Sequence, residues 1–235
     1  MTPEITLLTL SAATIAFAHT ILGPDHYLPF VAMAQARNWS TFKTFRITLV
    51  CGVGHILGSV MLGVVGITLG TQLSSLEWFE GLRGGMAAWA LTGFGVMYTA
   101  WGLRLAYRKK PHTHWHEDAG LKYCHKHNHD EHLEHAHESG KRSLTPWLIF
   151  LIFVLGPCEP LIPLLMYPAA TENAVAVLLV TGVFGLVAVL TMTMMVILVS
   201  LGLKTIKLSR FEHYSHAVAG STILVCGLSV VFLGI

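Results

Sequence analysis

Six long hydrophobic segments constrain the environment of this chain more than any other feature of its sequence. They cover Ile5–Ala34, Phe45–Leu69, Leu82–Ala106, Leu144–Tyr167, Ala174–Leu203 and His213–Ile235. Each is longer than the roughly 20 apolar residues that a helix needs to cross a bilayer. Only 12% of the 235 residues are charged, against about 25% in soluble domains. We therefore expect an all-α, polytopic membrane protein with six transmembrane helices in a lipid bilayer, and an ordinary soluble enzyme is excluded.

The distribution of charged residues predicts how the six spans are oriented in the membrane, and the small net charge argues against a nucleic-acid partner. If six spans alternate, 14 of the 15 Lys and Arg residues fall on one side and only Arg83 on the other. Cytoplasmic loops of membrane proteins are enriched in Lys and Arg. We therefore expect a multi-pass protein of the cell (inner) membrane with both termini outside the cytosol. The net charge of +2 is too small to indicate a nucleic-acid partner.

The two halves of the sequence resemble each other. Residues 22–24 (Leu-Gly-Pro) recur at 155–157, Gly52-Val53 recurs at Gly182-Val183, and Phe79-Glu80 recurs at Phe211-Glu212. These matches lie at a nearly constant separation of about 130 residues, as expected of an internal repeat. Each half holds three spans, so the halves must be inverted relative to each other, as in many secondary transporters. The expected organisation is a first three-helix repeat (1–107), a polar loop (108–143) and a second repeat (144–235).

Gly-Pro pairs interrupt the first and fourth segments, at Gly23-Pro24 and Gly156-Pro157. Proline removes a backbone donor and clashes with the preceding helical turn. The backbone groups that this frees need partners, so both spans must face protein or a water-filled cavity rather than lipid. We therefore expect transmembrane helices 1 and 4 to be broken at these pairs.

Ionisable side chains follow both Gly-Pro pairs inside hydrophobic segments, where a charge costs about 2.5–3.5 kcal/mol on insertion scales. Membrane proteins keep such groups when they pair, relay protons or bind ions. Imidazole with carboxylate suits nickel, cobalt, zinc or iron(II), whereas thiolates and thioethers favour copper(I) or zinc. The first candidate metal ligands are His19, Asp25 and His26, and the second are His55, Cys158 and Glu159.

The run from His19 to His26 resembles the signature of nickel/cobalt transporters, a His followed by an Asp-His pair on an early span. It is similar in particular to small six-span nickel permeases related to urease accessory membrane proteins, within the lysine-exporter-like group. The resemblance implies that His19, Asp25 and His26 select and carry the metal. One departure is that five residues, not four, separate His19 from the Asp-His pair. The expected function is transport of a divalent metal, nickel or cobalt before zinc, iron or copper, without catalysis or a permanent cofactor.

Nine of the 14 histidines lie in the polar loop between the halves. They are His112, His114, His116, His125, His127, His129, His132, His135 and His137. Histidine at alternate positions in a flexible chain chelates divalent ions. We expect this cytosolic loop to be an accessory metal-binding segment without a packed core, and a cytosolic metallochaperone is a candidate partner.

A second resemblance competes with the first. Gly156-Pro157-Cys158 looks like the Gly-Pro-Cys run of thiol–disulfide electron-transfer membrane proteins of the cytochrome c maturation type. Those proteins use two cysteines, one from each half, and the position that matches Cys158 in the first half here is Asp25. We therefore keep thiol–disulfide transfer as the alternative function, together with a metal accessory protein that does not transport.

Overall fold

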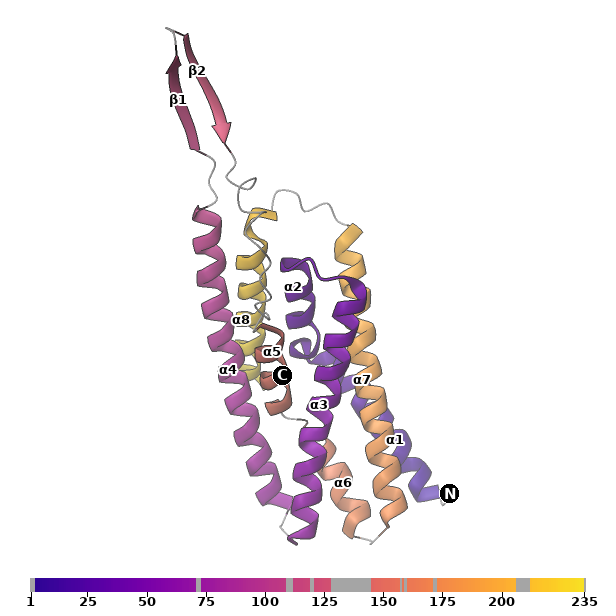
Figure 1. Ribbon diagram of the computed structural model, residues 1–235. Coiled ribbons are helices and arrows are strands. Elements are labelled where there is room, and N and C mark those ends of the chain that lie inside the picture. Colours follow the sequence, from indigo (N-terminus) through magenta and orange to yellow (C-terminus); the bar gives the residue numbers. More distant parts are fainter. Residues whose placement is uncertain are drawn as a thin grey trace.

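The computed structural model describes residues 3–70, 73–108, 112–118, 121–127, 145–156, 158, 160–170, 173–205 and 212–234. Within these ranges the protein has eight α-helices and a two-stranded hairpin (Figure 1). The helices are α1 (Pro3–Leu22), α2 (Leu28–Ala36), α3 (Thr41–Thr68), α4 (Leu73–Arg108), α5 (Thr145–Leu155), α6 (Leu161–Ala170), α7 (Ala174–Thr205) and α8 (Ser215–Leu233). Two 3-10 turns, η1 (Pro24–His26) and η3 (Glu212–Tyr214), precede α2 and α8.

Four of the described helices are long and apolar enough to cross a membrane. They are α1, α3, the Ala174–Leu203 part of α7, and α8. Large apolar side chains are exposed along their outer faces, as expected where the solvent is lipid. The expected all-α, polytopic membrane fold is therefore confirmed at this level.

Both interruptions occur where the Gly-Pro pairs predict them. Helix α1 ends at Leu22, and the chain turns through η1 before α2 begins at Leu28. Helix α5 ends at Leu155, and α6 begins at Leu161. In the first break the Gly23 N–H still donates to the His19 carbonyl at 3.0 Å, and the His26 N–H donates to Gly23 at 3.1 Å. These bonds satisfy backbone groups that lipid could not satisfy.

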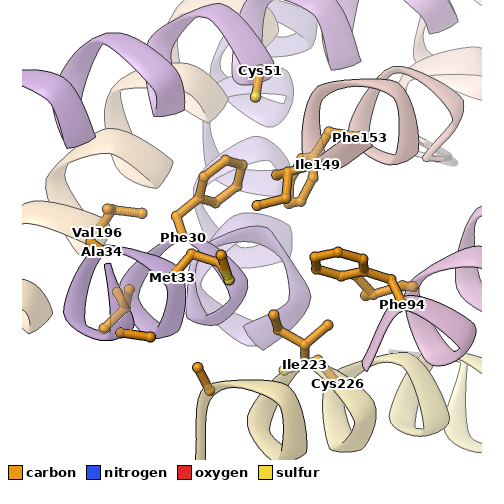
Figure 2. Close-up of a cluster of buried hydrophobic side chains, with 14 of the residues drawn as sticks. Phe30, Met33, Ala34, Cys51, Phe94, Ile149, Phe153, Val196, Ile223 and Cys226 are labelled. Carbon is orange, nitrogen blue, oxygen red and sulfur yellow. The ribbon is translucent and has the colours of Figure 1, made fainter. Parts of the chain in front are cut away.

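A buried apolar cluster anchors the short helices on either side of the breaks (Figure 2). Phe30 of α2 packs edge-on against Phe153 of α5, with ring centroids 4.4 Å apart. Phe94 of α4 and Ile223 of α8 belong to the same cluster. The segments that carry the breaks therefore meet in the interior of the bundle.

Small residues bring α4 and α8 into close antiparallel contact. A Cβ on Gly95 would lie 2.5 Å from the Leu224 backbone nitrogen, and one on Gly227 would lie 2.5 Å from Thr92 Oγ1. Close approach of backbones at small residues is a common way for membrane helices to associate. The interface therefore has no space for even a methyl group at these positions.

We expect Gly95→Ala to destabilise the protein by about 1–3 kcal/mol, since the new methyl group forces α8 away from α4. Gly93→Ala is the matched control, because it lies two residues away on the same helix and a Cβ there meets nothing within 4 Å. That change should be neutral or stabilise the helix by up to about 1 kcal/mol. Thermal unfolding of the detergent-solubilised variants measures both, and equal stabilities would contradict the tight α4·α8 interface.

The hairpin differs from the expected loop without ordered structure. Strands β1 (His112–Asp118) and β2 (Leu121–His127) are antiparallel, and their register pairs His112 with His127 and His114 with His125. Two adjacent extended segments satisfy each other's backbone hydrogen bonds across the strand pair, and hydrophobic periodicity in such a polar stretch gives no signal of this pairing. The predicted metal-binding residues His129, His132, His135 and His137 lie outside the described residues.

Candidate functional site

Three histidines and one aspartate meet at the first helix break. His19 lies in the last turn of α1, His26 in η1 and His55 in the middle of α3. The ring centroids of His19 and His26 are 4.8 Å apart, and those of His26 and His55 are 5.5 Å apart. On an unbroken helix, residues seven apart would be separated by about 10 Å. The break therefore brings the His26 ring back against His19.

Asp25 and His26 form a hydrogen-bonded pair within this cluster. His26 Nδ1 lies 3.1 Å from Asp25 Oδ1 and 3.2 Å from the Gly23 carbonyl oxygen. Both neighbours are acceptors, so Nδ1 carries the proton and donates to them. A carboxylate beside an imidazole is also the arrangement that lowers the cost of keeping either group inside a membrane.

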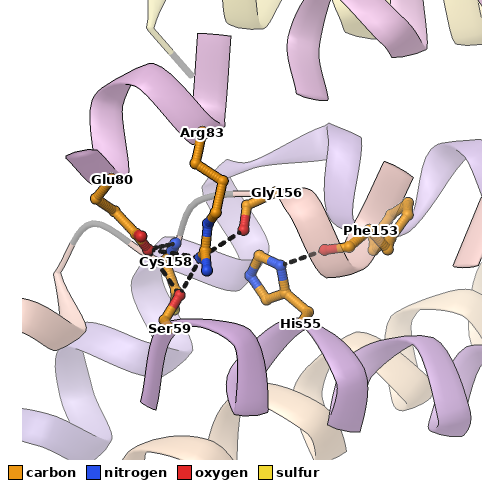
Figure 3. A network of polar contacts seen from close by, with 7 residues as sticks. All are labelled: His55, Ser59, Glu80, Arg83, Phe153, Gly156 and Cys158. Atoms are coloured by element: carbon orange, nitrogen blue, oxygen red, sulfur yellow. Dashed lines mark hydrogen bonds and ion pairs between the residues drawn. The ribbon is translucent and has the colours of Figure 1, made fainter. Parts of the chain in front are cut away.

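Two imidazole nitrogens of the cluster have no hydrogen-bond partner among the described residues. The His55 Nδ1–H donates to the Phe153 carbonyl oxygen at 3.0 Å (Figure 3). In a neutral ring the other nitrogen, Nε2, then holds a lone pair. This Nε2 and the Nε2 of His19 are both buried and unpartnered there. Buried polar atoms in native proteins are rarely left unpaired, so these two nitrogens indicate a functional site.

Cys158 lies at the second break and is buried beside the cavity that the histidines line. Its side chain is 1% exposed. It lines one small cavity together with His19, His26 and His55, and Met192 of α7 closes that cavity. The two helix breaks therefore place a thiol from the second half next to imidazoles from the first half.

A buried ion pair fixes the backbone around Cys158 (Figure 3). Glu80 Oε1 accepts hydrogen bonds from Arg83 Nη2 at 2.8 Å, from Ser59 Oγ at 2.7 Å and from the Cys158 N–H at 2.8 Å. Arg83 Nη2 also donates to the Gly156 carbonyl oxygen at 3.0 Å. Both backbone groups belong to the interrupted span, where no helix can satisfy them.

Sequence reasoning missed both members of this pair. Glu80 lies just before the predicted third segment and Arg83 is its second residue, so the sequence predicts both charges at the end of the span outside the cytosol. Helix α4 instead begins at Leu73 and has 36 residues, so both charges lie on it inside the bundle. The available signal was their opposite charge at a spacing of three residues, which places two side chains on one helical face.

An open cavity of about 450 Å³ reaches the cluster from outside. Asp25, His26 and His19 are among the residues that line it. Its wall is the face of α4 that carries Gly81, Gly84 and Gly85, and α8 borders it near Gly234. Because glycine has no side chain, this face of α4 leaves space beside Asp25.

Most of the predicted site residues come together. His19, Asp25, His26, His55 and Cys158 line neighbouring cavities that share residues, whereas Glu159 lies outside the described residues. Of the hairpin histidines, the structure describes only the backbone. Within the described part of the chain, no three His, Cys, Asp or Glu side chains are arranged to hold a metal ion. The role of these residues as metal ligands stays a prediction.

A comparison with known families resolves the two competing resemblances. A family model described as the cytochrome C biogenesis protein transmembrane region matches residues 28–233. No curated protein and no solved structure matched the chain. The resemblance to nickel/cobalt transporters is therefore wrong, and so is the function of divalent-metal transport drawn from it. The match supports the alternative function, thiol–disulfide transfer, which the Gly156-Pro157-Cys158 run suggests.

Proposed function

The chain belongs to the family of cytochrome c biogenesis protein transmembrane regions, and on this premise we propose that it transfers thiol–disulfide equivalents in the membrane through Cys158. One observation carries the proposal. Cys158 is buried at a helix break inside the matched region, and it shares a cavity with three imidazoles. The thiolate is the reactive form of cysteine, and an adjacent imidazole is the usual group that generates it.

Cys158 acts in this proposal as a single exchanging thiol. Its counterpart in the first half of the repeat is Asp25, so the pair of cysteines expected of such proteins is not formed by these two positions. The free thiols Cys51 and Cys226 line other cavities than the one of Cys158. Among the cysteine side chains that the structure describes, none lines the cavity of Cys158 beside it, so in this proposal the second sulfur comes from a partner molecule.

The exchange proceeds in two balanced steps. First, Cys158 Sγ gives up its proton and attacks one sulfur of a partner disulfide, so that a mixed disulfide forms and the partner's second sulfur leaves and takes up a proton. Second, a thiol of another partner attacks the mixed disulfide, which restores the Cys158 thiol. The net result is that the first partner's disulfide opens to release one thiol, and its other sulfur becomes part of a disulfide with the second partner.

The same proposal includes six spans in two inverted halves. Helices α1 with α2, and α5 with α6, form the broken first and fourth spans, and α3, α4, α7 and α8 form the others. The hairpin, the beginning of α3 and the end of α7 lie at one end of the bundle in Figure 1. The N-terminal end of α1 and the end of α6 lie at the other. This arrangement supports spans that cross the membrane in alternating directions. The hairpin then lies on the cytosolic side of the inner membrane, and both termini lie outside the cytosol.

The test is exchange by the full chain in proteoliposomes. Reduced glutathione and a peptide disulfide are supplied, and the mixed disulfide is identified by mass spectrometry. We expect Cys158→Ser to abolish the acceleration of exchange over empty vesicles. Cys51→Ser and Cys226→Ser are the matched controls and should retain it. Full exchange by the Cys158→Ser variant, or an adduct only at Cys51, would overturn the proposal.

A further inference from the structure

An open apolar groove lies on the outside of the bundle between α3 and α5, and none of the clustered histidines lines it. Its volume is about 450 Å³. The groove is lined by Ile47 and Val50 of α3 and by Trp147 and Phe150 of α5. Val50 is 57% exposed and Trp147 is 65% exposed. In a membrane-spanning bundle, such an open apolar wall is continuous with the surface that faces lipid chains.

Two cations stand at the rim of this groove. Lys43 and Arg46 both line it, and they lie one helical turn apart at the beginning of α3. Both side chains are exposed. Lys43 Nζ lies 5.5 Å from the Trp39 ring, and Arg46 Cζ lies 5.7 Å from the Phe42 ring. Within the described part of the chain, neither has a carboxylate partner that would neutralise it.

The backbone adds positive potential at the same end of the groove. A Cβ on Gly54 would lie 3.0 Å from the Phe150 ring, and one on Gly58, one turn further along α3, would lie 2.9 Å from the Val154 carbonyl oxygen. Because a later residue of α3 meets a later residue of α5, the two helices run parallel here. Their N-terminal ends therefore lie at the same end of the bundle, and each carries a partial positive charge from the helix dipole.

From this combination we propose that the groove binds a phospholipid with an anionic headgroup. The headgroup phosphate lies between Lys43 and Arg46, and one acyl chain occupies the space between Val50, Trp147 and Phe150. A soluble anion would use the cations but not the apolar walls. A zwitterionic lipid would use the walls but gain less from two unpaired cations. This site is independent of thiol exchange at Cys158, so either proposal can fail without the other.

The test measures lipid retained by the full chain. The protein is reconstituted with equimolar dioleoylphosphatidylglycerol and dioleoylphosphatidylcholine, released into detergent and examined by native mass spectrometry. We expect the wild type to retain phosphatidylglycerol preferentially. The double variant Lys43→Gln/Arg46→Gln should lose about fivefold in affinity for each cation removed, which corresponds to about 1 kcal/mol each.

Two further variants separate a built site from general surface charge. Arg104→Gln/Arg108→Gln removes the same charge from exposed positions on α4, and it should leave retention unchanged. Val50→Trp keeps both cations but fills the groove, so it should lose the bound lipid. Equal losses in the two double variants would overturn the proposal. So would equal retention of both lipids by the wild type, or unchanged retention by Val50→Trp.

Discussion

Replacement of Glu80 by alanine is expected to destabilise the folded protein by about 3–5 kcal/mol, the cost of removing one partner of a buried ion pair. Glu80 is 1% exposed, and the Arg83 side chain is 17% exposed. Without the carboxylate, the guanidinium keeps its charge inside the bundle with no counter-ion among the described residues. The Cys158 N–H and the Ser59 hydroxyl lose their acceptor as well. Thermal unfolding in detergent measures this loss.

Two comparisons make the expectation about Glu80 specific. Glu77→Ala removes the same charge three residues earlier on α4, where the side chain is exposed, and it should change stability by less than about 0.5 kcal/mol. Glu80→Leu/Arg83→Met replaces the pair with apolar groups and should recover much of the loss, because no unpaired charge remains. A double variant as unstable as Glu80→Ala would show that the bonds to the interrupted span matter more than the pairing itself.

The helix breaks were predictable because their cause is local. Proline at residue 24 cannot donate a backbone hydrogen bond, so the interruption after Leu22 follows from sequence alone. The convergence of His26 on His19 follows from that break. The close contact of α4 with α8 was not predictable in the same way. Gly93 and Gly95 look alike in the sequence, and only the position of α8 makes one a contact and the other an exposed residue.

The ionisable residues of the candidate site could be predicted from the sequence, but the residues that hold the backbone around them could not. Ionisable groups inside apolar segments stand out because their burial is costly, and this indicated His19, Asp25, His26 and His55. The role of Arg83 depends on where α4 begins and on the carbonyl of Gly156, which lies 73 residues further along the chain. Contacts between segments so distant in sequence have no local signature.

The function was misassigned for a physical reason. Imidazoles and a carboxylate inside a membrane are compatible with ion binding, proton transfer and thiol activation, so an eight-residue signature from His19 to His26 does not discriminate among them. The family match extends over residues 28–233 and therefore includes the second break with Cys158. The pattern along the whole chain distinguishes functions that share the same few side chains.

The largest effect on chemistry is expected at His55. Its Nδ1–H is bonded to Phe153, its Nε2 is buried without a partner in the described part of the chain, and the ring contacts Gly156, two residues before Cys158. A Cβ on Gly156 would lie 3.2 Å from His55 Nδ1. His55 lines the same cavity as Cys158, and in the proposed exchange its Nε2 accepts the thiol proton. A positioned general base contributes about 10²–10⁴ to a rate.

We therefore expect His55→Gln to slow the reaction of Cys158 with methyl methanethiosulfonate by about 100-fold. The thiol forms a disulfide with the methylthio group, methanesulfinate leaves, and the imidazole takes the proton. Glutamine can still donate to the Phe153 carbonyl oxygen, so the local structure is retained while the base is lost. Mass spectrometry of the proteoliposomes follows the modification. Cys226, which lines a different cavity, is the internal reference and should react at the wild-type rate. If Cys158 and Cys226 slow together, His55 has a structural role only, and an unchanged rate at Cys158 would assign the proton to another group.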